Sequence, residues 1–408
     1  MRKILFTALS VLALFAISCS SDKDAPRVND EPNEPLQLTI EQEAINKAEI
    51  NMAIDIFEEM FADADNQDNI MFSPLSKDLC LSIMSNVVDD DSKKTIMEKY
   101  GASSATALNE YNRSRMEYFS YNGSKAKVAF ANSIWANTQT MKSESDFTNA
   151  TKDIVKYYNA EQRLLDFGTK DIKGLINNWC SDKTNGLIPK FLDEEPDNTT
   201  QSIFINAMYF DCSWKSPFAK SGDEIEKFYK PDGISRACGV HYMSSIRSVP
   251  ATVNDDYSAF SMAYANCNYS AIFVLPNTDK TIKDIIPQIN DILVCEDLKK
   301  ESIYPCSIKI PRFTTNYTKD LQGYITNSGI DFDNMELSGY GKMASSIIRQ
   351  ATMLSLSEEG TKAAASTGGM TGTALSTTKI HLDRPFLMIV KDDNTATILL
   401  LAAIQYPK

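Results

Sequence analysis

The sequence predicts a single α+β domain over residues 39–408. Hydrophobic residues make up 43% of the 408-residue chain, which is enough to bury a large core. The predicted strands and helices are interspersed, without the regular alternation that a doubly wound parallel sheet requires. No internal repeat and no second linker follow residue 38. We therefore expect one mixed unit that is larger than most single domains.

Residues 1–18 have the features of a secretion signal: Arg2 and Lys3 precede an apolar run, and small residues precede Cys19. The apolar run is too short, and wrongly flanked, for a membrane-spanning helix. Because it ends on a cysteine, the segment resembles a bacterial lipoprotein signal, which implies that Cys19 is lipidated after cleavage. An ordinary signal peptide with an accidental cysteine is the alternative.

Residues 19–38 are polar, rich in proline and without periodicity, which is typical of a tether. The acidic residues soon after Cys19 resemble the surface-export signal of some Gram-negative lipoproteins. We therefore expect the protein to cross the inner membrane and to be held by a lipid anchor in the outer membrane. Periplasmic and cell-surface orientations both remain open.

The first helix of the domain begins at a capping box formed by Thr39 and Gln42. Its apolar face consists of Ile45, Ala48, Met52, Ile56 and Met60. Further helices are predicted at 75–86 and 171–184. Strands are predicted at 128–136, 202–210, 271–275, 307–313, 386–390 and 397–404, with a hairpin turn at 392–394 between the last two.

The composition argues against several classes of function. A net charge of −13 repels phosphate backbones, so no nucleic-acid partner is expected. His241 and His381 are the only histidines, and no HExxH or GxSxG motif occurs, so we expect no metal, no cofactor and no catalytic activity. The cysteines after Cys19 form no CxxC pair, and most are expected to be buried small side chains: Cys80, Cys180, Cys212, Cys238, Cys267, Cys295 and Cys306.

The segment "EEGTKAAASTGGMTGTALS" at 358–376 has an unusual composition. No charge occurs between Lys362 and Lys379, in a chain that is 23% charged. In a strand, the odd positions from Thr361 onward would carry only small uncharged side chains, whereas Lys362 and Met370 would share the even face. One face could therefore be buried while the other stays in water. A flexible loop of glycine, serine and threonine is the alternative.

Five motifs carry a resemblance to one family. "EEGTKAAAST" resembles the hinge of the reactive-centre loop in serpins, and four more segments resemble serpin motifs in serpin order: "NIMFSPLS", "INAMYFDCSWKSPF", "AIFVLP" and "DRPFLMIVKDDNTATILLLAAIQYP". The resemblance covers residues 39–408. It implies three β-sheets surrounded by about eight or nine helices, with an exposed reactive-centre loop at about 358–380.

The resemblance also implies a function. A serpin inhibits a serine protease irreversibly: the protease cleaves the loop, and the freed hinge inserts into the main sheet as a new strand. The implied hinge is Glu358, Glu359, Gly360, Thr361, Lys362, Ala363, Ala364, Ala365 and Ser366. The implied shutter, a hydrogen-bonded group beneath the parting strands, is Ser73, Ser76, Asn206 and Gln350.

Three residues depart from the family pattern. Lys362 replaces a glutamate on the even face of the hinge, and Cys212 replaces a glycine. Gln350 replaces a histidine in the shutter. Because glutamine can both donate and accept, the hydrogen bonds can survive while the pH sensitivity of histidine is lost.

Two counts along the family pattern, one from Glu358 and one back from Pro385, place the cleaved bond at Ala374–Leu375. A small residue before the cut suits elastase-like or broad-specificity proteases, while Met370, Leu375 and Lys379 are rival cut sites. Inhibition of cysteine proteases is also open. We expect a monomer.

Two other functions are compatible with part of the sequence. Gly368, Gly369 and Gly372 could slow insertion, as in a non-inhibitory binding module or sacrificial substrate with the same fold. A nutrient-binding surface lipoprotein would account for the signal and tether but for nothing in 358–408.

Overall fold

The computed structural model describes residues 30–64, 68–139, 143–168, 171–219, 225–229, 238–300, 305–331, 335–337, 341–342, 347–361 and 378–407. The α-helices are α1 (Ile40–Asp63), α2 (Pro74–Met84), α3 (Asp90–Tyr100), α4 (Ala105–Phe119), α5 (Glu144–Ala150), α6 (Lys152–Tyr158), α7 (Ile172–Lys183), α8 (Ile282–Ile285), α9 (Ile289–Val294) and α10 (Gln322–Asn327). A 3-10 turn, η1 (Ile286–Gln288), joins α8 directly to α9, so these ten segments form nine helical bodies in the described part of the chain. A second 3-10 turn, η2, spans Glu296–Leu298.

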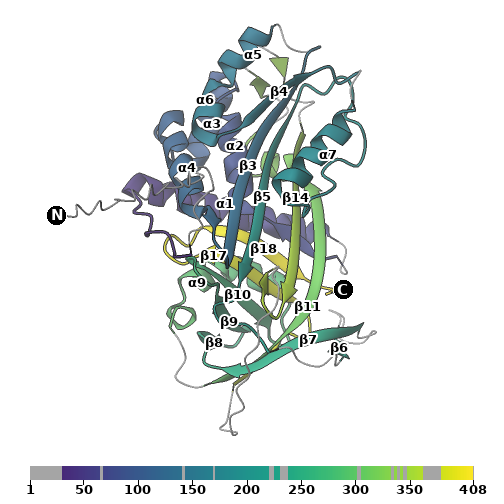
Figure 1. Ribbon diagram of the computed structural model, residues 1–408. Helices are drawn as coiled ribbons and strands as arrows, with labels where there is room; N and C mark the ends of the chain where they lie inside the picture. The colour runs from purple at the N-terminus through teal and green to yellow at the C-terminus, as the bar shows by residue number, and fades with distance from the viewer. Residues whose placement is uncertain are drawn as a thin grey trace, which may run out of the picture.

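The largest sheet is built around four long strands that run side by side through the middle of the molecule (Figure 1). Its strands are β2 (Tyr121–Asn122), β3 (Ala126–Asn137), β4 (Glu161–Leu165), β5 (Ser202–Ser213), β15 (Gly360–Thr361), β14 (Ile347–Ser357) and β11 (Cys306–Asp320). The far end of β11 continues into a second ladder with β7 (Cys238–Arg247), β6 (Ile225–Phe228) and β16 (Thr378–His381). We call the part that contains β3, β5, β14 and β11 the main sheet.

A separate six-stranded sheet packs behind the main sheet and contains the C-terminal hairpin. Its strands are β1 (Ile70–Phe72), β18 (Ile398–Ile404), β17 (Phe386–Asp392), β10 (Tyr269–Pro276), β9 (Tyr257–Ala263) and β8 (Ala251–Val253). A short pair, β12 (Glu336–Leu337) and β13 (Gly341–Lys342), completes the described strands. The predicted α+β class is confirmed, and the strand predicted at 307–313 proves to be the first half of the longer β11.

The two faces of the main sheet cover different cores. The larger core lies between this sheet, the six-stranded sheet and most of the helices, and it contains Phe204 and Cys212 of β5. A smaller core lies between the opposite face and α7, and it contains Ile203, Ile205 and Ala207 of the same strand. Even positions of β5 therefore face inward and odd positions face α7, as the two-residue period of a strand requires.

Helix α2, which lies beneath the main sheet, is buried along its whole length and carries two charged residues. Lys77 and Asp78 form an ion pair there, and Arg115 of α4 pairs with Glu49 of α1. Burial raises the pKa of Glu49 and Asp78, while the facing Arg115 and Lys77 oppose that rise. These contacts tie α1, α2 and α4 together, because separating either pair would leave a buried charge without its partner.

The segment before the first helix lies along the domain. Asn33 donates to the Tyr118 carbonyl (2.6 Å) and accepts from the Asn268 side chain (2.8 Å), and Leu36 and Leu38 pack against the larger core. Residues 30–38 have no helix or strand, as expected of a tether, but these contacts hold them against the domain. The described part of the predicted tether, residues 30–38, is therefore docked on the domain, and the signal and Cys19 lie outside the described residues.

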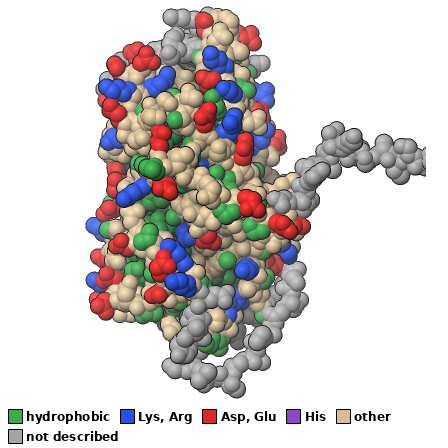
Figure 2. Space-filling model, turned by 90° about the vertical axis from the view of Figure 1, so that its left-hand side faces the viewer, with side chains coloured by type: hydrophobic (Ala, Val, Ile, Leu, Met, Phe, Trp, Pro, Cys, Tyr) green, Lys and Arg blue, Asp and Glu red, His purple; other side chains and the backbone are tan. Residues whose placement is uncertain are grey.

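Acidic and basic side chains are interspersed over the face that Figure 2 shows, in keeping with the modest excess of acid. Within the described residues, no helix is both long enough and apolar enough to span a membrane.

Candidate functional site

The two central strands of the main sheet pair with each other at one end only. There, β5 and β14 run parallel, with Ile347 opposite Ile203 and Ile348 opposite Phe204. At the other end the two-residue strand β15 lies between them and pairs antiparallel with both. Between these points, among the residues that the structure describes, each strand is paired only on its outer side, β5 with β3 and β14 with β11. The main sheet is thus open along its middle.

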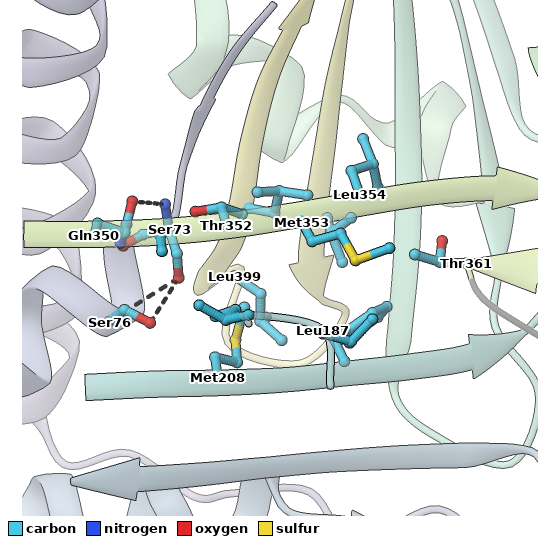
Figure 3. A pocket seen from close by; sticks show the side chains of 15 residues that line it. Ser73, Ser76, Leu187, Met208, Gln350, Thr352, Met353, Leu354, Thr361 and Leu399 are labelled. Carbon is cyan, nitrogen blue, oxygen red and sulfur yellow. Dashed lines mark hydrogen bonds between the residues drawn. The ribbon is translucent and has the colours of Figure 1, made fainter. Parts of the chain in front are cut away.

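Side chains of α2, β5, β14, β17 and β18 surround the space between the two strands. A cavity of about 30 Å³ remains, which has room for one or two water molecules. Its lining includes Met208 of β5, Thr352 and Leu354 of β14, and Leu399 of β18, with Ser73 and Ser76 of α2 at one end and Thr361 at the other. Figure 3 shows this arrangement, with the Gln350–Ser73 contact on the side away from Thr361.

The hinge residues that the structure describes are held by main-chain hydrogen bonds. The Glu359 carbonyl accepts from the Trp214 amide (2.7 Å), and the Glu358 carbonyl accepts from the Phe218 amide (2.7 Å). The Glu358 carboxylate pairs with Arg312 of β11 at 3.0 Å. The start of the hinge is therefore docked on the sheet.

Thr361 occupies the buried face. It is only 4% exposed, and its hydroxyl shares a hydrogen bond of 2.8 Å with the Tyr264 hydroxyl. Tyr264 stacks on Trp214 with ring centroids 4.6 Å apart, and the Trp214 indole N–H donates to the Ser357 carbonyl. Since Thr361 is opposite Cys212, an inward-facing residue of β5, the odd positions of the hinge start on the inward side.

Gly360 passes unusually close to the neighbouring strand. A Cβ at this position would lie 2.2 Å from the Cys212 carbonyl oxygen and 2.6 Å from the Ser213 Cα. Both contacts are with backbone, so neither can be relieved by moving a side chain. Glycine is required here for the chain to enter the sheet.

Three of the four implied shutter residues form one hydrogen-bonded group. The Gln350 side-chain oxygen accepts from the Ser73 amide and its nitrogen donates to the Ser73 carbonyl, both at 2.8 Å. The Ser73 hydroxyl donates to the Ser76 hydroxyl at 3.1 Å and accepts from the Ser76 amide as the cap of α2. The side-chain amide of Gln350 thus uses both its N–H donor and its oxygen acceptor on the backbone of Ser73.

Asn206 is not hydrogen-bonded to this group. Its amide nitrogen donates to the side chain of Asn132 on β3 (2.7 Å), which is directly opposite in the β3–β5 register. Its side-chain oxygen is buried and has no hydrogen-bond partner among the described residues, and the same holds for the Thr352 hydroxyl. Two polar atoms at the edges of the opening therefore have no hydrogen-bond partner in the described part of the chain.

The chain matches the family model "Serpin (serine protease inhibitor)" over residues 47–407. The chain belongs to the serpin family. The horse leukocyte elastase inhibitor is 24% identical over 385 residues, which cover 90% of this chain and all of that protein. Native tengpin, a thermophilic serpin, has the same fold with a TM-score of 0.78 and 24% identity, over 93% of this chain and 97% of tengpin. Thyroxine-binding globulin in complex with thyroxine also shares it, with a TM-score of 0.76 and 19% identity over 90% of this chain and 99% of the globulin.

Serpins are in general protease inhibitors rather than catalysts. In this serpin, the remaining hinge residues from Lys362 to Ser366 and the implied cleavage site, Ala374 and Leu375, lie outside the described residues. Lys379, a rival cut site, is part of β16 and pairs in register with Ser307 of β11. A bond within a hydrogen-bonded strand is poorly presented to a protease, which argues against cleavage there.

Sequence reasoning missed several residues that hold the hinge. Trp214 lies in a motif that it singled out, but its contact with Tyr264 could not be seen from either segment alone. The Arg312–Glu358 ion pair and the Asn132–Asn206 bond also join residues far apart in the chain. A local pattern contains no signal for such pairs.

The first prediction concerns the shutter of this serpin. In Gln350→His, a neutral imidazole could accept from the Ser73 amide and donate to its carbonyl, whereas the protonated ring has no acceptor for that amide. The histidine pKa should therefore be lower in the folded state, and stability should be lost as pH falls through about 6.5. Urea unfolding at about pH 8 and about pH 5.5 should show an added loss of up to about 1.4 kcal/mol at the acidic pH.

Gln350→Ala is the control, because it removes both bonds at every pH and should cost roughly 1–3 kcal/mol at both. If wild type and Gln350→His lose stability in parallel between the two conditions, the geometry assigned to the shutter is wrong.

Proposed function

We propose that this serpin is an irreversible suicide-substrate inhibitor of serine proteases, cleaved at Ala374–Leu375. The observation that carries the proposal is the docked start of the hinge, with Gly360 and Thr361 already between β5 and β14 at one end of an open sheet. The opening continues in the direction in which the chain would have to run. A strand added there would be hydrogen-bonded on both sides.

If the pairing of β15 with β5 and β14 is extended along the loop in the same register, the neighbours of each inserted residue can be assigned. Ala363 would come between Phe210 and Leu354, and Ala365 between Met208 and Thr352, which all line the cavity. The space left between these larger side chains is small, so alanine fits where a long side chain would not.

Thr367 would then come between Asn206 and Gln350 on the inward face. Its hydroxyl could donate to the buried Asn206 side-chain oxygen, which has no partner among the described residues of the intact protein. The inserted strand would thus satisfy a polar atom that the intact fold leaves unpaired.

Full insertion requires two further changes. The direct pairs of Ile347 and Ile348 with β5 must break, because Gly369 would take their place. The far end of the loop must also be released, because β16 is paired in parallel with β11 from Thr378 onward. Cleavage between Thr361 and Thr378 supplies that release, and this is why insertion would follow the cut.

The proposed inhibition depends on the distance over which insertion of the loop moves the attached protease. Residues 360–374 make a strand of about 50 Å at roughly 3.3 Å per residue. An attached protease would be carried from one end of the sheet to the other, and distortion of its active site would stall hydrolysis of the acyl-enzyme. Ala374 before the cut favours elastase-like or broad-specificity proteases, and proteases of the cysteine class are a further possible target.

The proposed location rests on the sequence. Lipidation of Cys19 would anchor the inhibitor to the outer membrane, where it would meet proteases outside the cytoplasm. We expect the anchored inhibitor to be a monomer.

A non-inhibitory binding module or sacrificial substrate is the second candidate. Gly368, Gly369 and Gly372 favour it, since glycine weakens strands. Thyroxine-binding globulin, which has the same fold, binds thyroxine in its solved complex, so this fold is compatible with binding a ligand.

The second prediction tests the cleaved bond. The protein is mixed with an elastase-like protease and the SDS-stable complex is isolated. The C-terminal peptide released from that complex should begin at Leu375. Peptides that begin only after Met370 or after Lys379 would contradict the assignment, and cleavage without any stable complex would favour the second candidate.

The third prediction concerns metastability. Cleavage in the loop should raise the melting temperature by about 10 °C or more, because a full strand of backbone hydrogen bonds is added. Thr367→Val, which lacks the hydroxyl that would reach Asn206, should show a smaller rise. Ser366→Ala on the opposite face is the matched control and should show the full rise. Equal melting of intact and cleaved wild type would exclude insertion.

The fourth prediction tests which face of the hinge is buried. Thr361→Arg would force an unpaired cation toward Tyr264 and the core, at a cost of roughly 3–5 kcal/mol. Insertion should then be slower than hydrolysis, so the variant becomes a plain substrate that is cut at the same bond.

Lys362→Glu is the neighbouring control. Its side chain would be opposite Asp211 on the outer face, where a charge change costs at most about 1 kcal/mol, so it should inhibit nearly as well as wild type. The ratio of stable complex to cleaved product on gels distinguishes the two variants. An equal loss of complex in both would mean that the two faces were assigned wrongly.

A further inference from the structure

Two cysteines meet where the hinge enters the main sheet. Cys212 lies near the end of β5, in register with Thr361. Just beyond it, Trp214 forms a β-bridge with Tyr264, and the Ala265 amide donates to the Ser213 carbonyl at 2.8 Å. These contacts bring the turn between β9 and β10, which contains Cys267, against the end of β5.

Cys267 packs against the hydrophobic core in which Cys212 is buried. Both are free in this structure, Cys212 is fully buried and Cys267 is partly exposed. Burial, and after it the neighbouring Cys267 thiol, raises the pKa of the Cys212 thiol well above its usual range. By comparison, burial alone raises the pKa of Cys80 and of Cys180 to about 12. Cys212 thus differs from these two buried cysteines in having a thiol partner.

We propose that Cys212 and Cys267 are a redox pair that is oxidised to a disulfide by exchange with a small-molecule disulfide. The two residues have different roles because their exposure differs. Solvent and oxidant can reach Cys267, which is partly exposed, whereas Cys212 is fully buried and is closed to a small-molecule disulfide in solution.

The exchange takes two balanced steps. The Cys267 thiolate attacks one sulfur of the small disulfide, the S–S bond breaks, and the leaving thiolate takes up a proton. The Cys212 thiol then loses its proton and attacks the Cys267 sulfur of the mixed disulfide, which releases the second small thiol. In sum, two protein thiols are oxidised and one small disulfide is reduced to two thiols.

The new bond would join the main sheet to the six-stranded sheet directly below the hinge. The β5 end carries the Cys212 carbonyl against which Gly360 packs, and the Trp214 amide that bonds to Glu359. Fixing this end to the β9–β10 turn limits its local opening. The oxidised protein should therefore hold the docked hinge more rigidly than the reduced protein.

The test uses the full chain, reduced and then incubated with oxidised glutathione. Remaining thiols are blocked, the protein is digested without reductant, and the peptides are identified by mass spectrometry. Wild type should yield a peptide pair joined through Cys212 and Cys267. Cys212→Ser should instead retain glutathione on Cys267, because the first step can occur but the second cannot.

Cys267→Ser should give neither product, and Cys180→Ser, which changes a buried cysteine elsewhere, should form the joined pair as wild type does. Glutathione that stays on Cys267 in wild type, with no joined pair, would overturn the proposal. Modification of neither residue would overturn it as well.

Amide hydrogen exchange tests the consequence for the hinge. Peptides that contain Trp214 should exchange several-fold more slowly in the oxidised wild type than in the reduced protein, and this difference should be absent in Cys267→Ser. Equal exchange in the oxidised and reduced wild type would contradict the rigid docking inferred from the disulfide.

Discussion

The opening between β5 and β14 is the constraint on which the rest of the structure depends. Adjacent strands normally pair along their whole length, since an unpaired edge leaves backbone donors and acceptors without partners. Here the pairing is limited to two residues at one end, and two residues of the hinge separate the strands at the other. The fold therefore carries a place for one more strand within a sheet that is otherwise complete.

The layers on either side keep this opening from collapsing. From below, the end of α2 is fixed to β14 through Gln350 and Ser73. The same helix is held by buried charges, because Lys77 and Asp78 are paired within it and α1 and α4 are joined beside it by Glu49 and Arg115. From above, α7 packs on the odd-numbered residues of β5. Closing the opening would require these buried polar contacts to be rearranged together, which is costly.

The hinge is docked by a mixture of main-chain and side-chain contacts. Gly360 allows the close approach, Thr361 takes a buried hydroxyl partner, and the Arg312–Glu358 pair holds the turn that precedes them. Each contact lies at the start of the loop, so none needs the loop to be cut. The start of the added strand is thus in place before any protease acts, and the unsatisfied atoms of Asn206 and Thr352 lie further along the same path.

The sequence by itself determined the local features of this protein. Strand alternation was enough to assign Thr361 to the inward face, and the hinge motif placed Gly360 at the start of the segment that inserts. The α+β class, three of the ten described α-helices and six of the longer strands followed from periodicity and turn residues, because those signals act over a few neighbouring positions.

Only the tertiary structure decided which distant residues meet. Asn206 bonds to Asn132 instead of to the shutter, residues 30–38 are docked where a tether was expected, and Cys212 lies beside Cys267. Each of these contacts depends on how sheets and turns pack against one another. A period of two or 3.6 residues fixes which face of an element is buried, but it carries no information on the side chain that will be found opposite.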